Sequence, residues 1–481
     1  MATPLLLLEL LCFSMALAGG AALRLELAHV DANEHCTMEE RVRRATERTH
    51  HRRLLHASTA AAAGGVAAPL RWSGKTQYIA SYGIGDPPQP AEAVVDTGSD
   101  LVWTQCSTCR LPAAAAAGGG GCFPQNLPYY NFSLSRTARA VPCDDDDGAL
   151  CGVAPETAGC ARGGGSGDDA CVVAASYGAG VALGVLGTDA FTFPSSSSVT
   201  LAFGCVSQTR ISPGALNGAS GIIGLGRGAL SLVSQLNATE FSYCLTPYFR
   251  DTVSPSHLFV GDGELAGLSA AAGGGGGGGA PVTTVPFAKN PKDSPFSTFY
   301  YLPLVGLAAG NATVALPAGA FDLREAAPKV WAGGALIDPG SPFTRLVDPA
   351  HRALTKELAR QLRGSGSLVP PPAKLGGALE LCVEAGDDGD SLAAAAVPPL
   401  VLRFDDGVGG GRELVIPAEK YWARVEASTW CMAVVSSASG NATLPTNETT
   451  IIGNFMQQDM RVLYDLANGL LSFQPANCSA V

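Results

Sequence analysis

The sequence predicts an all-β protein with two similar lobes and a few short helices. After about Lys75, short apolar segments alternate with turn residues, which is typical of β-strands. The chain also has 59 glycines and 32 prolines, residues that favour turns. A motif of two apolar residues, then Asp, one further residue and Gly, occurs twice in the chain. This duplication predicts two similar lobes. The clearest strand candidates are residues 78–84, 190–193, 201–206, 299–305 and 460–466.

Length and composition exclude several classes of protein. The chain has 481 residues, more than one ordinary domain of about 100–200 residues. Hydrophobic residues make up 47% and charged residues 15%, so a large core can form and wholesale disorder is excluded. The net charge of −11 argues against a protein that tracks nucleic-acid phosphates, so we expect no nucleic-acid partner.

The segment 1–70 differs from the rest of the chain. An apolar run ends in Ala16-Leu17-Ala18, and it predicts a secretory signal peptide over residues 1–18 rather than a membrane anchor. Thr37 to Glu40 form a capping box, and the Arg-rich stretch to Leu55 predicts a helix. This stretch is either a solvated basic helix or a prosegment whose cations cover an acidic site until low pH weakens the pairing.

Two helices are expected in the remaining chain. Asp348 caps the first, which has Pro349 at its first position and runs to about Arg363. Residues 231–236 form a shorter one. Low-complexity runs at residues 113–121 and 273–279 are expected to be exposed loops.

Cysteine usage indicates an oxidising compartment. There are 14 cysteines, and 12 remain after Cys12 and Cys36 leave with the segment 1–70, an even number that favours disulfides. Cys106 and Cys109 resemble half a zinc site, but no second pair follows, so we expect no metal and no cofactor. Asn-x-Ser/Thr sequences predict glycosylation at Asn131, Asn237, Asn311, Asn441 and Asn447.

The duplicated motif carries the chemistry. Val94 to Ser99 reads Val-Val-Asp-Thr-Gly-Ser, and Leu336 to Ser341 reads Leu-Ile-Asp-Pro-Gly-Ser. Each copy is followed by a second apolar-Gly motif, at residues 221–226 and 451–453. A strand that ends in Asp and turns at Gly lets backbone N–H groups approach the carboxylate. Two such turns facing each other would pair Asp96 with Asp338. One carboxylate could then activate water while the other protonates a carbonyl oxygen.

On these motifs the chain resembles the pepsin-like aspartic proteases, and within them the plant nepenthesin-like branch. The resemblance covers roughly Lys75 to Val481 and includes the stretches 84–89, 96–106, 224–235 and 241–244. It implies a bilobal pepsin-like fold that binds an extended polypeptide substrate between the lobes. The paired carboxylates of aspartic proteases share one proton in the same way.

The resemblance also implies roles for further residues. Tyr177 and Gly178 match the flap that closes over substrate, and Trp103 matches the usual partner of the flap tyrosine. The residues that would support the two catalytic loops are Thr97, Gly98, Ser99, Gly340 and Ser341. The implied disulfides are Cys106–Cys109, Cys122–Cys205, Cys143–Cys171, Cys151–Cys160, Cys244–Cys478 and Cys382–Cys431.

We therefore expect four regions along the chain. Residues 1–18 form the signal peptide, 19–70 the prosegment, 71–250 the N-terminal lobe with Asp96 and the flap, and 251–481 the C-terminal lobe with Asp338. We expect the mature protein to be a monomer in the extracellular space of a plant, with the vacuole as the alternative location. The expected activity is that of an acid endopeptidase made as a zymogen.

Two departures from the family pattern keep a second function open. Pro339 stands where the family has Ser or Thr, so this position has neither a hydroxyl nor an N–H. The flap sequence after Gly178 lacks the usual polar pair. The alternative is a catalytically impaired binding protein of the same fold, such as an inhibitor of microbial glycosidases. A structural cell-wall glycoprotein would explain the glycosylation sequences but not the paired Asp motifs.

Overall fold

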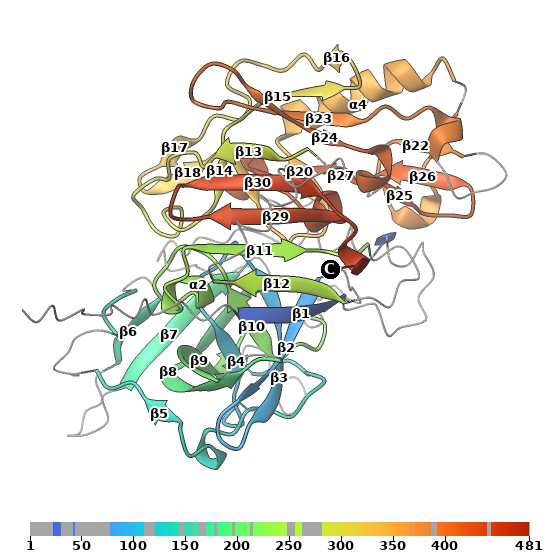
Figure 1. Ribbon diagram of the computed structural model, residues 1–481. Helices are drawn as coiled ribbons and strands as arrows, with labels where there is room; N and C mark the ends of the chain where they lie inside the picture. The colour runs from blue at the N-terminus through green and yellow to red at the C-terminus, as the bar shows by residue number, and fades with distance from the viewer. Residues whose placement is uncertain are drawn as a thin grey trace, which may run out of the picture.

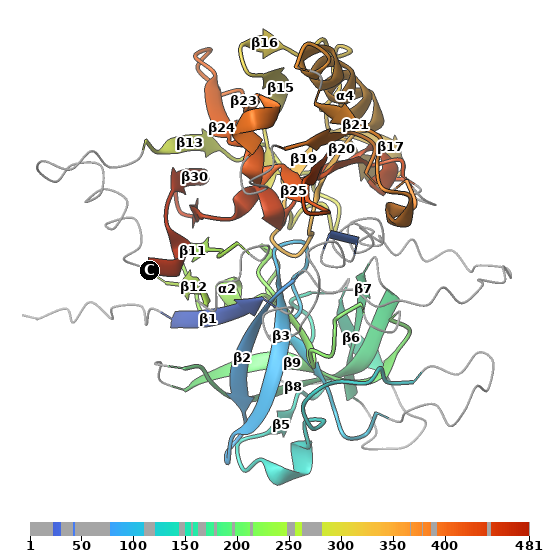
Figure 2. The same cartoon turned by 90° about the vertical axis from the view of Figure 1, so that its right-hand side faces the viewer.

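The computed structural model describes residues 23–29, 42–43, 77–109, 121–143, 150–154, 157–161, 170–177, 180–194, 198–211, 215–247, 255–261, 281–365, 367–377, 379–385, 392–439 and 444–480. In these residues strands dominate and helices are few, as expected (Figure 1). The two lobes lie one above the other in both views, and the strands near the chain's middle and end run between them (Figure 2).

One 15-stranded sheet runs from the N-terminal lobe into the C-terminal lobe. Its order is β13-β30-β29-β11-β12-β1-β2-β3-β10-β4-β9-β8-β7-β6, and β5 pairs with β8 off this path. The strands of the N-terminal lobe are β2 (Tyr78–Ile84), β3 (Gln89–Asp96), β4 (Trp103–Gln105), β5 (Arg139–Ala140), β6 (Ala158–Ala161), β7 (Ala170–Tyr177), β8 (Gly180–Thr192), β9 (Val199–Thr209) and β10 (Gly221–Gly224). Those between the lobes are β1 (Leu23–His29), β11 (Glu240–Cys244), β12 (Ser256–Val260), β13 (Thr283–Pro286), β29 (Met460–Asp465) and β30 (Leu470–Pro475).

Four smaller sheets build the C-terminal lobe, in the orders β14-β19-β28-β20-β27, β16-β15-β23-β24, β17-β18 and β21-β22-β26-β25. Their strands are β14 (Tyr301–Leu302), β15 (Leu304–Ala309), β16 (Ala312–Thr313), β17 (Arg324–Ala327), β18 (Val330–Ala332), β19 (Ala335–Ile337), β20 (Thr344–Leu346), β21 (Leu368–Val369), β22 (Cys382–Glu384), β23 (Leu400–Phe404), β24 (Arg412–Ile416), β25 (Trp422–Arg424), β26 (Thr429–Met432), β27 (Val434–Ser436) and β28 (Thr450–Ile452).

Apart from the helical residues 42–43, the described part of the chain contains two α-helices. Helix α2 (Leu232–Gln235) is capped by Ser231, whose Oγ accepts a hydrogen bond from the Ser234 N–H at 3.2 Å. Helix α4 (Asp348–Leu362) packs on β15 and β27. Its N-cap is Val347, so the expectation that Asp348 caps this helix is wrong: Asp348 lies in the first turn, where its negative charge favours the helix dipole.

Short 3₁₀ turns connect many of the strands. They are η1 (Phe132–Leu134), η2 (Ala373–Leu375), η3 (Leu392–Ala395), η4 (Ala418–Lys420), η5 (Thr446–Glu448), η6 (Asn454–Gln457) and η7 (Cys478–Ala480).

Strand β1 comes from the region expected to be a prosegment. It is an internal strand, because it pairs antiparallel with β12 on one side and with β2 on the other. Its alternate residues Leu23, Leu25 and Leu27 are buried in the main core. The predicted helix after Thr37 lies mostly outside the described residues, although Val42 and Arg43 are helical.

Candidate active site

The two halves of the duplicated motif adopt the same local topology. Strand β3 ends at Asp96 and pairs in parallel with β10, which carries the first apolar-Gly motif. In the C-terminal lobe, β19 ends one residue before Asp338 and pairs in parallel with β28, which carries the second. The sequence repeat therefore corresponds to a structural repeat, one copy in each lobe.

The glycines of the apolar-Gly motifs lie against the chain that follows each Asp. A Cβ atom at Gly224 would be 2.3 Å from the carbonyl carbon of Asp100. A Cβ atom at Gly453 would be 2.5 Å from the carbonyl carbon of Phe343. No side chain can occupy either position, so glycine is required for the turn after each Asp to pack down on the neighbouring strand.

The first turn holds the Asp96 carboxylate with its own backbone and side chains. The N–H of Gly98 donates to Oδ1 at 2.9 Å, and the hydroxyl of Ser99 donates to Oδ2 at 2.7 Å. Asp96 is 1% exposed, so these donors replace the water that a buried carboxylate would otherwise need.

The second turn repeats this arrangement around Asp338. The N–H of Gly340 donates to Oδ1 at 2.8 Å, and the hydroxyl of Ser341 donates to Oδ2 at 2.6 Å. Asp338 is 4% exposed. Two buried carboxylates thus have matching sets of donors, two and three residues further along the chain in each case.

The two carboxylates lie close together across the lobes. A Cβ atom at Gly98 would lie 3.2 Å from Asp96 Oδ1 and 3.8 Å from Asp338 Oδ2. One point beside Gly98 is therefore within 4 Å of an oxygen from each carboxylate. The hydroxyl of Thr97 donates to the Ile337 carbonyl at 3.0 Å and ties the two turns to each other.

Pro339 breaks the symmetry of this tie. The turn in the first lobe contributes a hydroxyl at Thr97, but the equivalent position in the second lobe has neither a hydroxyl nor an N–H. The Pro339 carbonyl accepts a hydrogen bond from the Asn454 side-chain amide at 2.8 Å, and the Asn454 N–H donates to the Ser341 carbonyl at 2.7 Å. Asn454 therefore stabilises the second turn through these two hydrogen bonds.

The candidate flap lies in the N-terminal lobe, next to the Asp96 turn. Tyr177 is the last residue of β7, and its hydroxyl accepts a hydrogen bond from Trp103 Nε1 at 2.6 Å. Burial and the negative charge of Asp96 raise the pKa of Tyr177, while contacts with Trp103 and Ser99 oppose this shift. The structure thus brings Tyr177 and Trp103 together beside the Asp96 turn, whereas Gly178 lies outside the described residues.

Sequence reasoning gave no role to four buried polar residues near the two turns. Asn454 directly follows the second apolar-Gly motif, and that position is a signal that could have identified it. Tyr243, Gln457 and Tyr464 form a hydrogen-bonded group that contacts the Ile452 carbonyl next to the second turn. No local pattern marks them, because they come from β11, η6 and β29 and meet only in the folded chain.

The implied disulfide pairing is partly wrong. Two expected pairs are present, Cys244–Cys478 and Cys382–Cys431. The other eight described cysteines pair as Cys106–Cys205, Cys109–Cys122, Cys143–Cys160 and Cys151–Cys171, in place of Cys106–Cys109, Cys122–Cys205, Cys143–Cys171 and Cys151–Cys160.

Strand register explains the first of these corrections. Strands β4 and β9 pair in parallel with Thr104 opposite Cys205, so Cys106 leaves β4 beside Cys205, with 5.4 Å between their Cα atoms. Cys109 is then free to reach Cys122, at a Cα separation of 5.7 Å.

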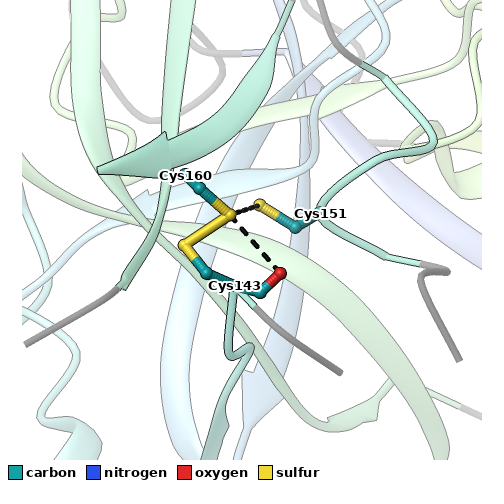
Figure 3. A group of neighbouring side chains, drawn as sticks. All are labelled: Cys143, Cys151 and Cys160. Carbon is teal, nitrogen blue, oxygen red and sulfur yellow. Dashed lines mark hydrogen bonds between the residues drawn. A yellow bond between two sulfur atoms is a disulfide. The ribbon is translucent and has the colours of Figure 1, made fainter. Parts of the chain in front are cut away.

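Three further sulfur atoms lie within 4.8 Å of one another, those of Cys143, Cys151 and Cys160 (Figure 3). The Sγ atoms of Cys151 and Cys160 are 3.7 Å apart without being bonded. Each sulfur is already bonded in a disulfide, so the cluster offers no thiolate to a metal.

The predicted glycosylation positions differ in accessibility. Asn237 and Asn311 are exposed, while Asn131 and Asn447 are half-buried. Asn131 caps η1, because its side chain accepts a hydrogen bond from the Ser133 N–H. Asn441 lies outside the described residues. Among the helices of the described ranges, none has the length and apolar character needed to cross a membrane.

Comparison with known proteins agrees with this geometry. A family model described as "Xylanase inhibitor N-terminal" matches residues 78–262, and one described as "Xylanase inhibitor C-terminal" matches residues 299–475. Aspartic proteinase nepenthesin-1 of Nepenthes gracilis is 32% identical over 455 residues, covering 94% of this chain and 90% of that protein. Aspartyl protease 37 of Oryza sativa subsp. japonica is 32% identical over 515 residues, covering 100% of this chain and 99% of that protein.

A solved structure shares the fold over nearly the whole length. The crystal structure of edgp aligns with a TM-score of 0.63 and 18% identity, covering 96% of each chain. The paired Asp turns and the parallel strand pairs are consistent with the family of these relatives. The chain belongs to the nepenthesin-like branch of the plant pepsin-like aspartic proteases.

Proposed function

We propose that the protein is an aspartic endopeptidase that hydrolyses peptide bonds with a water molecule activated between Asp96 and Asp338. The observation that carries this proposal is the matched geometry of the two carboxylates. Each is buried and accepts one N–H and one hydroxyl hydrogen bond, and an oxygen of each lies within 4 Å of the same point beside Gly98. The names of the relatives support the same activity.

The chemistry follows from two like charges in one site. The reaction needs one ionised and one protonated carboxylate, a division that one proton shared by two close carboxylates would provide. The ionised member takes a proton from water, whose oxygen then attacks the peptide carbonyl carbon. The protonated member gives its proton to the carbonyl oxygen. A proton then passes to the peptide nitrogen as the C–N bond breaks, which releases an amine and a carboxylic acid.

The position of the candidate flap supports an extended polypeptide as the substrate class. Tyr177 stands at the end of a hairpin beside Asp96, so closure of this hairpin would cover an extended polypeptide and limit the access of water. We propose that the enzyme acts as a monomer in the extracellular space, with the vacuole as the alternative. Six disulfides support an oxidising compartment.

The processing of the precursor is also a proposal. Residues 19–70 are proposed to be a prosegment that is cut after acidification. Strand β1 supports a folded precursor, because it lies between β12 and β2 and its loss would leave two sheet edges unpaired. Intact mass after incubation at acidic pH should show a shortened chain. A precursor that keeps its mass while cleaving substrate would refute this step.

The test of the activity is cleavage of an unfolded protein at about pH 3–6, the range in which a carboxylate pair can share one proton. The reaction is run with the acid-treated precursor, with and without a statine-type transition-state inhibitor. Asp96→Asn and Asp338→Asn keep the size of each side chain and should each abolish inhibitable cleavage. Thermal unfolding of both variants shows whether they are folded. Cleavage that survives in either folded variant would refute the assignment.

A second function is favoured by two observations. The matching family models are described as xylanase inhibitors, and Pro339 removes a hydroxyl and an N–H from the second turn. On this alternative the fold binds a microbial glycosidase and does not cleave peptides. A folded, processed protein that cleaves no substrate but lowers the activity of a microbial xylanase would establish it.

A further inference from the structure

We propose that Arg227, whose guanidinium lies over the rings of Phe287 and Tyr300, is a positioning residue that keeps the two catalytic turns in register. These three side chains are called the Arg227 clamp below. The inference rests on the proposed function, because the turns that the clamp joins carry Asp96 and Asp338. None of the three side chains is proposed to touch substrate.

A short path of hydrogen bonds connects the two catalytic turns through Leu225 and Tyr300. The Leu225 N–H donates to the Asp96 carbonyl at 2.8 Å, and the Leu225 carbonyl accepts from the Tyr300 hydroxyl at 2.9 Å. The Tyr300 carbonyl accepts in turn from the Ile337 N–H at 3.4 Å, and Ile337 directly precedes Asp338. The placement of Tyr300 therefore affects the spacing of the two carboxylates.

Arg227 holds Tyr300 in this place. Its guanidinium carbon lies 4.9 Å from the centroid of the Tyr300 ring and 4.6 Å from that of the Phe287 ring. A cation within about 6 Å of a ring centroid is attracted by the negative face of the ring. The backbone N–H of Arg227 also donates to the Thr298 carbonyl at 3.0 Å. Arg227 thus binds the stretch of chain around Tyr300 through its side chain and its backbone.

The residues on either side of Arg227 are bonded to the first catalytic turn. The Gly226 N–H donates to the Ser99 carbonyl at 2.9 Å, and the Gly228 N–H donates to Asp100 Oδ1 at 2.7 Å. A Cβ atom at Gly228 would lie 2.4 Å from Asp100 Cγ, so this close approach requires glycine. The loop after β10 is therefore fixed to the N-terminal lobe, while the Arg227 guanidinium contacts rings of the C-terminal lobe.

The clamp does not depend on a carboxylate. None of the ion pairs among the described residues includes Arg227, and a guanidinium stays charged throughout the acidic range. Burial raises the pKa of Tyr300, with Tyr464 and Asp100 adding to the rise and Arg227 opposing it, so its ring stays neutral. Phe287 does not titrate. Because an ion pair weakens when its carboxylate is protonated, a cation–π contact suits a lobe junction that must hold in acid.

The test compares Arg227→Met and Arg227→Lys with a control arginine. Arg227→Met keeps the side-chain length and the backbone N–H but removes the charge. It should lower kcat about fivefold, with KM changed less than about 1.5-fold, because each of two exposed cation–π contacts is worth about a factor of two. Arg227→Lys keeps the charge and should lose less than about threefold. Arg136→Met removes an exposed arginine bonded to Asp86, at the opposite end of β3 from Asp96, and should leave kcat unchanged.

A double-variant cycle connects the effect to the rings. Phe287→Leu keeps an apolar side chain but removes one ring face, so Arg227→Met should lower kcat only about twofold in this background. An equal loss in both backgrounds would overturn the clamp.

The pH profile separates the clamp from an ion pair. The ratio of kcat for the wild type to kcat for Arg227→Met should stay constant between about pH 3 and pH 6, because neither the guanidinium nor the rings titrate there. A ratio that approaches one at the acidic end would overturn the proposal, since Arg227 would then act through a carboxylate.

Urea unfolding keeps the proposal testable if the wild-type protein cleaves nothing. The wild type, Arg227→Met, Phe287→Leu and the double variant are compared at about pH 4 and about pH 7. The midpoint shift caused by Arg227→Met should be smaller in the Phe287→Leu background, by the same amount at both pH values. Additive shifts would refute the clamp, whereas coupled shifts in a protein that cleaves nothing would refute only the proposed function.

Discussion

The hydrogen bond between Trp103 and Tyr177 should couple these two residues in catalysis. Trp103→Phe removes the indole N–H that donates to the Tyr177 hydroxyl at 2.6 Å, and Tyr177→Phe removes the acceptor. Each variant loses the same bond, so the double variant should lose it only once. The two effects are therefore expected to be less than additive.

The size of the coupling follows from the environment of the bond. Trp103 is 0% exposed and Tyr177 is half-buried, and both groups are neutral. A net contribution of about 0.5–1.5 kcal/mol for such a bond corresponds to about 2- to 13-fold in kcat/KM. Trp103→Phe also removes ring contacts, since its centroid lies 6.4 Å from that of Phe123, so this variant should lose more stability than Tyr177→Phe.

The assay is the initial rate of peptide cleavage by the wild type, both single variants and the double variant at one acidic pH. Thermal unfolding of each protein confirms that it is folded at the assay temperature. A coupling within the stated range supports a flap held by Trp103. Effects on kcat/KM that multiply to within about 1.5-fold would refute the reasoning, because they would mean that the bond is absent when substrate is bound.

Three further outcomes are expected from disulfide mapping and stability. Peptide mapping without reduction should recover Cys106 joined to Cys205, and any other partner for Cys106 would contradict the β4–β9 register. Gly224→Ala should destabilise the fold by about 3 kcal/mol in urea unfolding, because its Cβ would lie 2.3 Å from backbone, whereas Gly159→Ala meets nothing within 4 Å and should change stability by less than about 0.5 kcal/mol. Burial lowers the pKa of His351, so the unfolded chain binds more protons and stability is lost as pH falls below about 6.5. His351→Gln should reduce this loss, which is up to about 1.4 kcal/mol per pH unit for one group, and an unchanged pH profile of unfolding would contradict the assignment.

Local pattern predicted five strand segments, a minority of the strands that the structure contains. Residues 78–84 form β2 with the predicted bounds, because alternating burial matches the alternation in the sequence. Residues 299–305 were predicted as one strand but are divided at Pro303, since proline has no N–H for the ladder. Strand β1 was not predicted at all, because a seven-residue strand from the first part of the chain gains its stability from pairing with β12 and β2.

The sequence by itself determined the two candidate carboxylate turns. The donors to Asp96 and Asp338 lie two and three residues further along the chain, so the local backbone geometry of an Asp-x-Gly-Ser turn is enough to bring them together. Tertiary structure alone decided what lies across from each turn. Thr97 meets the Ile337 carbonyl 240 residues away, and the hydroxyls of Tyr243 and Tyr464 meet across 221 residues. Such contacts depend on the register and packing of distant strands, which no local pattern of residues encodes.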